Sequence, residues 1–257
     1  MSGIEETFSE LGTSFLQLFE DQRKDFGNGM RLNQLIRDLS KKGIRALKVE
    51  DWQTVEDVKK GILSVWSEMN KLHVPSDLAW QRDAEAGQEM VEFFMVVAWY
   101  QMIFYEGKVD LNKLLPQEKG LDVTDPQWLK GAVDSVSELS KVVLEDYVLD
   151  HNLSAREYQQ LLEKYLSKMQ DLVDFLDQFE TIYPMVINNS RRRGFTNTFR
   201  GALGRIKGLL SLHKRELIRL RVDLELQEQL KKSLEQNETL SCQVSELVKK
   251  VTCLISK

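Results

Sequence analysis

Two glutamates lie where a strongly apolar segment begins, and their three-residue spacing places them on one face of a helix. They are Glu89 and Glu92, at the start of the segment 88–105, QEMVEFFMVVAWYQMIFY. A helix with this sequence is apolar around its whole circumference and must be buried on every side. Carboxylates are costly in such a place unless a cation pairs with them or water reaches them. The pair is therefore a candidate functional site.

A second acidic pair, Asp134 and Glu138, is four residues apart among the valines and leucines of 128–144. Two helices that each carry such a pair can bring four carboxylates together. Carboxylate oxygens are ligands of Mg²⁺ or Mn²⁺, and such ions can bind a phosphodiester and activate water. Acids at these spacings are also common on solvated helix surfaces. The alternative is therefore that both pairs simply face solvent, with the first at an exposed helix start.

Basic residues gather between positions 190 and 215, where no acid occurs. Arginine can bind phosphate oxygens bidentately, and Phe195 and Phe199 can stack on bases or pack in the core. The alternative is a solvated basic face that pairs with acids elsewhere in the protein. The candidate phosphate-binding residues are Arg191, Arg192, Arg193, Arg200 and Arg205.

Composition limits the class of protein. Glycine (14) and proline (4) are scarce in 257 residues, which predicts an all-α protein. The net charge of −5 excludes a protein that is basic over its whole surface, but it permits a local basic patch. Cys242 and Cys253 fall in one helical pattern, where a disulfide between them is geometrically unfavourable. With no apolar leader and no membrane span, we expect an intracellular protein, cytoplasmic or nuclear.

Apolar residues recur at helical spacing along most of the chain. We expect Asp125 to cap one helix with Pro126 at its first position, and Ser154 to form a capping box with Glu157. Trp80, Trp99 and Trp128 are expected in the core rather than as platforms for bases. The predicted helices span 4–24, 30–48 (with a basic side) after a break or kink at 27–29, 51–73, 80–105, 110–115, 126–149 and 155–180.

The last part of the chain differs in character, because charges of both signs mix from Glu216 onward. Apolar residues there alternate by four and three, which is the spacing of a coiled-coil seam. Two heptads are too few to be stable alone, so we expect this tail to pack on a neighbour or to fray. We divide the chain into a helical domain, 1–215, and a helical or coiled-coil extension, 216–257. The seam residues are Leu240, Val244, Leu247, Val251 and Leu254.

Two stretches resemble the translin superfamily, and more closely its nuclease branch, translin-associated factor X (Trax). Residues 87–116, GQEMVEFFMVVAWYQMIFYEGKVDLNKLLP, are similar to its central helix, which a QEYVEA-type motif opens. Residues 125–139, DPQWLKGAVDSVSEL, resemble the DYLLGVxDLxGEL motif of that branch, although the family's DY opening reads PQW here. Translin itself lacks an aspartate that matches Asp134, which favours the catalytic branch. The NSVxxGDY-like sequence of both branches is missing around 149–156.

The resemblance implies an all-α bundle of about seven helices, here with a long C-terminal helical extension. It implies closed, octamer-like assemblies with a translin-like subunit or with copies of the same chain. It also implies a Mg²⁺- or Mn²⁺-dependent ribonuclease site at the four acids and a basic RNA-contacting helix near 190–207. The implied substrates are single-stranded or small structured RNAs, such as small-interfering-RNA passenger strands or transfer-RNA precursors.

The leading hypothesis is a Trax-like, Mg²⁺-dependent endoribonuclease subunit in which Glu89, Glu92, Asp134 and Glu138 bind the metal. One rival is a catalytically inactive, translin-like scaffold that binds RNA or single-stranded DNA. Another is a helical adaptor that docks a coiled-coil partner through 216–257. Three outcomes distinguish these hypotheses. The nuclease should cleave RNA only with Mg²⁺, the scaffold should bind RNA without cleaving it, and the adaptor should capture a partner without binding RNA.

Overall fold

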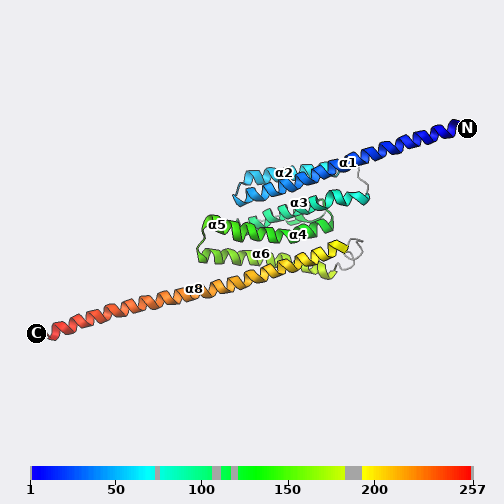
Figure 1. Ribbon diagram of the computed structural model, residues 1–257. Helices are drawn as coiled ribbons and strands as arrows, with labels where there is room; N and C mark the ends of the chain where they lie inside the picture. Colours follow the sequence, from blue (N-terminus) through cyan, green and yellow to red (C-terminus); the bar gives the residue numbers. More distant parts are fainter. Residues whose placement is uncertain (1, 73–75, 106–110, 117–120, 183–192, 256–257) are drawn as a thin grey trace.

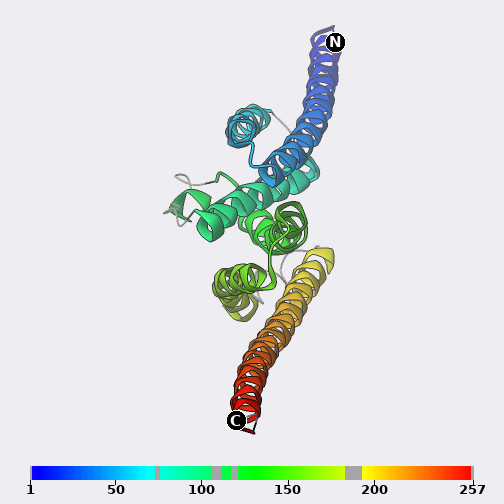
Figure 2. The same cartoon turned by 90° about the vertical axis from the view of Figure 1, so that its left-hand side faces the viewer.

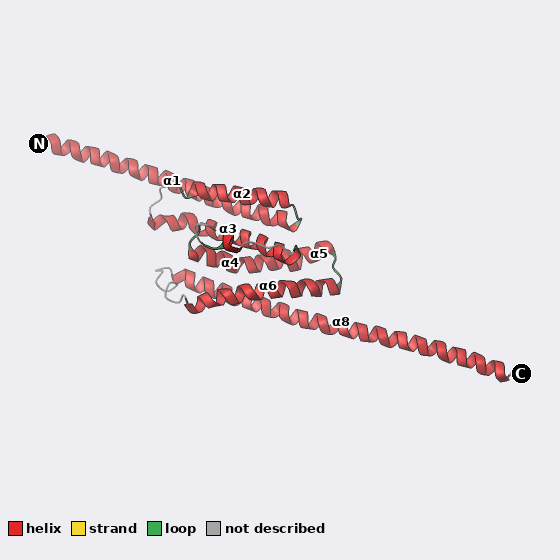
Figure 3. Ribbon diagram, turned by 180° about the vertical axis from the view of Figure 1, so that it is seen from behind, coloured by secondary structure: helices red, strands yellow, loops and turns green. Residues whose placement is uncertain are grey.

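The computed structural model shows long helices laid side by side, with one helix projecting from each end of the bundle in opposite directions (Figure 1). The structure describes residues 2–72, 76–105, 111–116, 121–182 and 193–255. These ranges contain helices and no strand (Figure 3). The expected all-α fold is therefore confirmed.

The predicted helices recur with shifted ends. The capping box of α6 forms as expected, because Ser154 N donates to Oε2 of Glu157 at 2.9 Å and Glu157 N donates to Oγ of Ser154 at 3.3 Å. A short 3-10 helix covers Leu111–Leu114, and a π-helical stretch, Lys141–Asp146, joins α4 to α5. The main helices are α1 (Ser2–Lys48), α2 (Trp52–Met69), α3 (Ser76–Phe104), α4 (Asp125–Ser140), α5 (Tyr147–His151), α6 (Ala155–Ile182) and α8 (Arg193–Ile255).

Two local predictions are wrong. The expected break at 27–29 does not occur, because α1 continues through Gly27 and Gly29 to Lys48. Glycine weakens a helix by only about 1 kcal/mol relative to alanine, and a helix of this length tolerates that loss. The residue that caps α4 is Thr124 rather than Asp125, which is already helical. Thr124 N and Oγ1 both donate to Oε1 of Gln127, each at 2.9 Å.

The helices are stacked in layers with α3 and α4 in the middle. Figure 2 shows α2 and α1 on one side, then α3, then α4, and then α6 with α8. The apolar segment of α3 is buried as its sequence predicts, with Met90, Val91, Phe93 and Val96 all fully enclosed. None of the helices in the described ranges is long and apolar enough to cross a bilayer.

A glycine sets the close approach of α3 and α4. A Cβ built on Gly131 of α4 would lie 2.6 Å from the carbonyl oxygen of Gln88 and 2.6 Å from Cβ of Val91, both in α3. These distances are too short for any side chain, so only glycine permits this packing. The contact lies one turn before Asp134 and beside Glu89 and Glu92. It therefore positions the two acidic pairs relative to each other.

Candidate functional site

The structure brings the two acidic pairs together where α3 meets α4. Gln88, which directly precedes Glu89, donates its Nε2 to Oδ2 of Asp134 at 2.6 Å. The negative charges of Glu89, Asp134 and Glu138 all act on Glu92 and raise its pKa. We call these four acids the acidic cluster. Its members come from facing sides of two helices, and all four are half-buried.

Glu92 is the member whose ionisation is most affected. Burial, and after it the charges of Glu89, Asp134 and Glu138, raises the pKa of Glu92 to about 8, while Lys141 opposes the rise. A carboxyl group with this pKa is largely protonated at neutral pH. A bound cation would favour its charged form, because an opposite charge nearby lowers the pKa of an acid.

Burial also raises the pKa of Glu89 and of Asp134. Arg37 and Lys41 of α1 oppose the rise at Glu89. Lys130, Arg205 and the hydrogen bond from Gln88 oppose it at Asp134. The acidic cluster therefore lies within the electrostatic reach of cations from three helices, α1, α4 and α8.

Two cations also contact the acidic cluster directly. The Nζ of Lys141 lies 3.2 Å from Oε2 of Glu138. The Nε of Arg37 lies 3.9 Å from Oε1 of Glu89, and its Nη1 bonds Oε2 of Glu85 at 2.8 Å. The sequence predicted a basic side for 30–48 but gave no sign that Arg37 would reach these acids. That contact depends on the packing of α1 against α3.

The chemistry of the acidic cluster fits a hard divalent cation, since it offers oxygen ligands and an excess of negative charge. As the side chains stand, however, no three His, Cys, Asp or Glu residues of the described part are gathered closely enough to hold a metal ion. Asp134 and Glu138 are oriented instead toward Gln88 and Lys141. The four acids are thus adjacent, in an arrangement held by an amide and two cations.

Of the five predicted phosphate-binding arginines, the structure describes the side chain of Arg205 alone. Arg191 and Arg192 lie outside the described residues, and Arg193 and Arg200 belong to the first turns of α8, where the structure describes the backbone but not their side chains. Arg205 is exposed, and its charge opposes the rise that burial causes in the pKa of Asp134. Arg205 is therefore the member of this set that the structure places at the acidic cluster.

Part of the basic segment pairs within the bundle, as the alternative interpretation expected. Lys207 donates to Oδ1 of Asp177 at 2.5 Å, and Lys214 donates to Oε1 of Gln170 at 2.5 Å, both on α6. These lysines hold α8 against α6. The basic segment therefore contains two lysines that stabilise the bundle and one arginine, Arg205, that is exposed.

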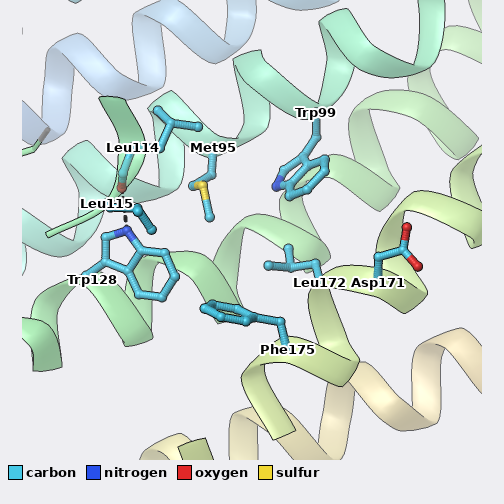
Figure 4. Close-up of a pocket in the computed structure, with 8 residues that line it drawn as sticks. All are labelled: Met95, Trp99, Leu114, Leu115, Trp128, Asp171, Leu172 and Phe175. Atoms are coloured by element: carbon cyan, nitrogen blue, oxygen red, sulfur yellow. Dashed lines mark hydrogen bonds between the residues drawn. The ribbon is translucent and has the colours of Figure 1, made fainter. Parts of the chain in front are cut away.

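An apolar pocket of about 300 Å³ lies between α3, α4 and α6 (Figure 4). Trp99 and Trp128, which line it, are 7% and 3% exposed. The Nε1 of Trp128 donates to the carbonyl oxygen of Leu114 at 2.5 Å. Both tryptophans thus belong to the core, as predicted, whereas the side chain of Trp80 lies outside the described residues. The other lining residues are Met95, Leu114, Leu115, Asp171, Leu172 and Phe175.

No protein-family model matches this chain, and no curated protein matches it. Several solved structures are similar to this chain. The crystal structure of AfC3PO superposes with a TM-score of 0.60 at 18% identity, covering 84% of this chain and 98% of that one. AfC3PO in complex with duplex RNA gives 0.58 at 20% identity, covering 83% and 96%. The apo form of NeC3PO gives 0.51 at 15% identity, also covering 83% and 96%.

The chain has the fold of C3PO. This likeness confirms the all-α architecture that the resemblance implied. Nearly the whole C3PO chain is matched, whereas this chain is longer than the part that it shares with C3PO. At these identities the likeness is one of fold.

Proposed function

We propose that this protein is an RNA-binding subunit of translin type that cleaves RNA at its acidic cluster with the help of Mg²⁺ or Mn²⁺. The observation that carries the proposal is the meeting of the two acidic pairs at the α3–α4 contact, with Arg205 of α8 beside them. The structure of AfC3PO, which has the same fold, has been solved in complex with duplex RNA, which supports RNA as the ligand.

Each residue has a role in this proposal. Glu89, Glu92, Asp134 and Glu138 would hold the cation, and Arg205 would bind a phosphate of the RNA. A bound divalent cation supplies positive charge to the phosphodiester and lowers the pKa of an attacking water. One carboxylate of the acidic cluster would accept the proton of that water as its oxygen bonds to phosphorus. The bond from phosphorus to one ribose oxygen would break, and that oxygen would take a proton from solvent. To hold the cation, Asp134 and Glu138 would exchange their present contacts with Gln88 and Lys141 for it.

The test is a cleavage assay on the purified full chain with end-labelled single-stranded RNA, in Mg²⁺ or in EDTA. Cleavage is expected in Mg²⁺ alone, and Asp134→Asn and Glu92→Gln are expected to abolish it. The matched control is Asp150→Asn, which removes an exposed carboxylate from α5 and should leave cleavage unchanged. Equal activity of Asp134→Asn and the control would overturn the proposed site.

A second candidate function is a scaffold that binds RNA or single-stranded DNA without cleaving it. The contacts of Arg37 with Glu89, of Gln88 with Asp134 and of Lys141 with Glu138 favour it, because they satisfy these acids without a metal. RNA binding that persists in EDTA, with no cleavage in Mg²⁺ or Mn²⁺, would select the scaffold over the nuclease.

The proposed partners are RNA and other translin-type subunits. The RNA is single-stranded or small and structured, and the subunits are copies of this chain or a translin-like protein in an octamer-like assembly. Sedimentation of the full chain, alone and mixed with a translin homologue, measures the mass of each assembly. A mixture that sediments as two independent species would exclude the mixed assembly.

A further inference from the structure

The part of α8 that extends beyond the bundle carries a heptad pattern longer than the one first evident at its end. Counting back from Leu247 in alternating steps of three and four reaches Leu226, and counting forward reaches Leu254. The pattern covers about four heptads, the length at which a coiled coil is indicated. We call it the seam: Leu226, Leu230, Ser233, Asn237, Leu240, Val244, Leu247, Val251 and Leu254.

The apolar residues of the seam are exposed wherever the structure describes their side chains. Leu226, Leu230, Leu240, Val244 and Leu247 are between 56% and 63% exposed. Single exposed leucines are ordinary on a protein surface, but an aligned row of them marks a site of association. Figure 1 shows this stretch of α8 running away from the other helices.

The seam lies on the side of α8 that faces away from the bundle. Arg221 and Glu228 are seven residues apart and bind Glu163 and Arg156 of α6, so they mark the side that faces α6. Leu226 and Leu230 lie two residues before and after Glu228. With 3.6 residues per turn, each is about 160° around the helix from that side. A second helix can therefore pack on the seam without meeting α6 of the same chain.

The residue types of the seam favour two parallel strands. Its a positions hold Leu230, Asn237, Val244 and Val251, and its d positions hold leucine except at Ser233. β-Branched residues at a, here Val244 and Val251, with leucine at d favour parallel dimers, and one asparagine at an a position fixes their register. In a parallel, in-register pair, Asn237 meets the same residue of the second chain. In an antiparallel pair it would face an apolar residue and leave its amide unsatisfied.

The residues that flank the seam are compatible with self-association. Between 227 and 243 the e and g positions hold glutamine, serine and leucine, and none of them is charged. Two copies of this chain therefore bring no like charges together across the seam. A different partner selected by charge would need complementary charges at these positions, and they are absent from this stretch of sequence.

We propose that residues 226–254 form a parallel, in-register, two-stranded coiled coil with a second copy of this chain. The proposal is independent of the acidic cluster and of any activity toward RNA. It extends the expectation of two heptads, which counted only the fully apolar end of the seam.

Cysteine cross-linking of the full chain tests it. In a background with Cys242→Ser and Cys253→Ser, Leu230→Cys places one thiol at an a position, where its copy lies across the seam. We expect most of this protein to run as a covalent dimer on a non-reducing gel after mild oxidation. The matched control keeps Cys242, an exposed f position, and carries only Cys253→Ser. The proposal is overturned if the thiol at position 230 cross-links no more than the thiol of Cys242 in this control. An antiparallel pair or a different partner would give that result.

A second pair of variants shows whether the seam causes the cross-link. Leu240→Glu with Leu247→Glu, added to the Leu230→Cys protein, places two charges in the seam and should lower the cross-linked fraction at least tenfold. Thr239→Glu with Ser245→Glu adds the same charges at c and b positions and should leave that fraction unchanged. Equal cross-linking by the two double variants would overturn the proposal.

Discussion

The side-chain amide of Gln88 on α3 donates to Oδ2 of Asp134 on α4 across 2.6 Å. This bond joins the two helices that carry the acidic cluster and orients one of its carboxylates. It lies beside Gly131, where the two backbones come closest. The geometry of the acidic cluster therefore depends on helix packing as much as on the acids themselves.

Gly131→Ala should destabilise the protein by about 2 kcal/mol, because the new methyl group meets the backbone of Gln88 and Cβ of Val91 in a packed core. Chemical denaturation followed by circular dichroism measures the change. Gly208→Ala is the matched control, since nothing lies within 4 Å of a Cβ on that helical glycine. The control should be neutral or slightly stabilising. Equal effects of the two substitutions would contradict the close α3–α4 contact.

Glu92→Gln should stabilise the metal-free protein at alkaline pH. The folded-state pKa of Glu92, about 8, lies above its ordinary value of 4.5. The folded protein therefore holds a proton that the unfolded chain releases, and wild-type stability falls as the pH rises from 4.5 through 8. The variant lacks this loss, so we expect it to be more stable by about 2–4 kcal/mol at pH 9 and equal near pH 4.5. Denaturation in EDTA at both pH values measures the difference, and a gap that does not change with pH would contradict the assignment.

Mg²⁺ should raise the melting temperature of the wild-type protein at pH 8 even without RNA. Binding to the folded state alone at ten times the dissociation constant corresponds to a shift of about 2–4 °C. Asp134→Asn should abolish the shift, and Asp150→Asn should retain it. Differential scanning calorimetry with and without EDTA gives this result independently of cleavage. A shift of the same size in Asp134→Asn would place the cation elsewhere.

Arg205→Ala should weaken RNA binding about threefold to tenfold and reduce the slope of affinity against salt by about one. Arg219→Ala is the matched control, an exposed arginine about 21 Å further along the same helix. Fluorescence anisotropy with labelled single-stranded RNA at several salt concentrations measures both quantities. If the two variants bind alike, Arg205 does not contact the RNA.

Sequence patterns predicted most of the helices, because each helix depends on the spacing of apolar and capping residues within its own segment. The burial of α3 follows from its uninterrupted apolar run, and the cap at Ser154 follows from two residues three apart. The continuity of α1 could not be predicted this way, because two glycines are a common helix break. The chain nevertheless stays helical through both of them.

Contacts between helices that are distant along the chain were harder to predict from the sequence. The spacing of each acidic pair indicated one face of a helix, but only the packing of α3 on α4 decides that the faces meet. Arg37 shows the same limit, because its approach to Glu89 joins positions 52 residues apart along the chain. In α8, the polar residues Ser233 and Asn237 interrupt the apolar pattern and make the heptad repeat look shorter than it is.

The unbroken course of α8 has a mechanical consequence. One helix of 63 residues runs from Arg193 to Ile255, which corresponds to a rod about 95 Å long. Long helices curve gently, and sharp kinks occur mainly at proline, which is absent from 193–255, so the two ends of α8 move together. Two bundles joined by their tails would therefore be kept apart by a continuous, gently curving helix.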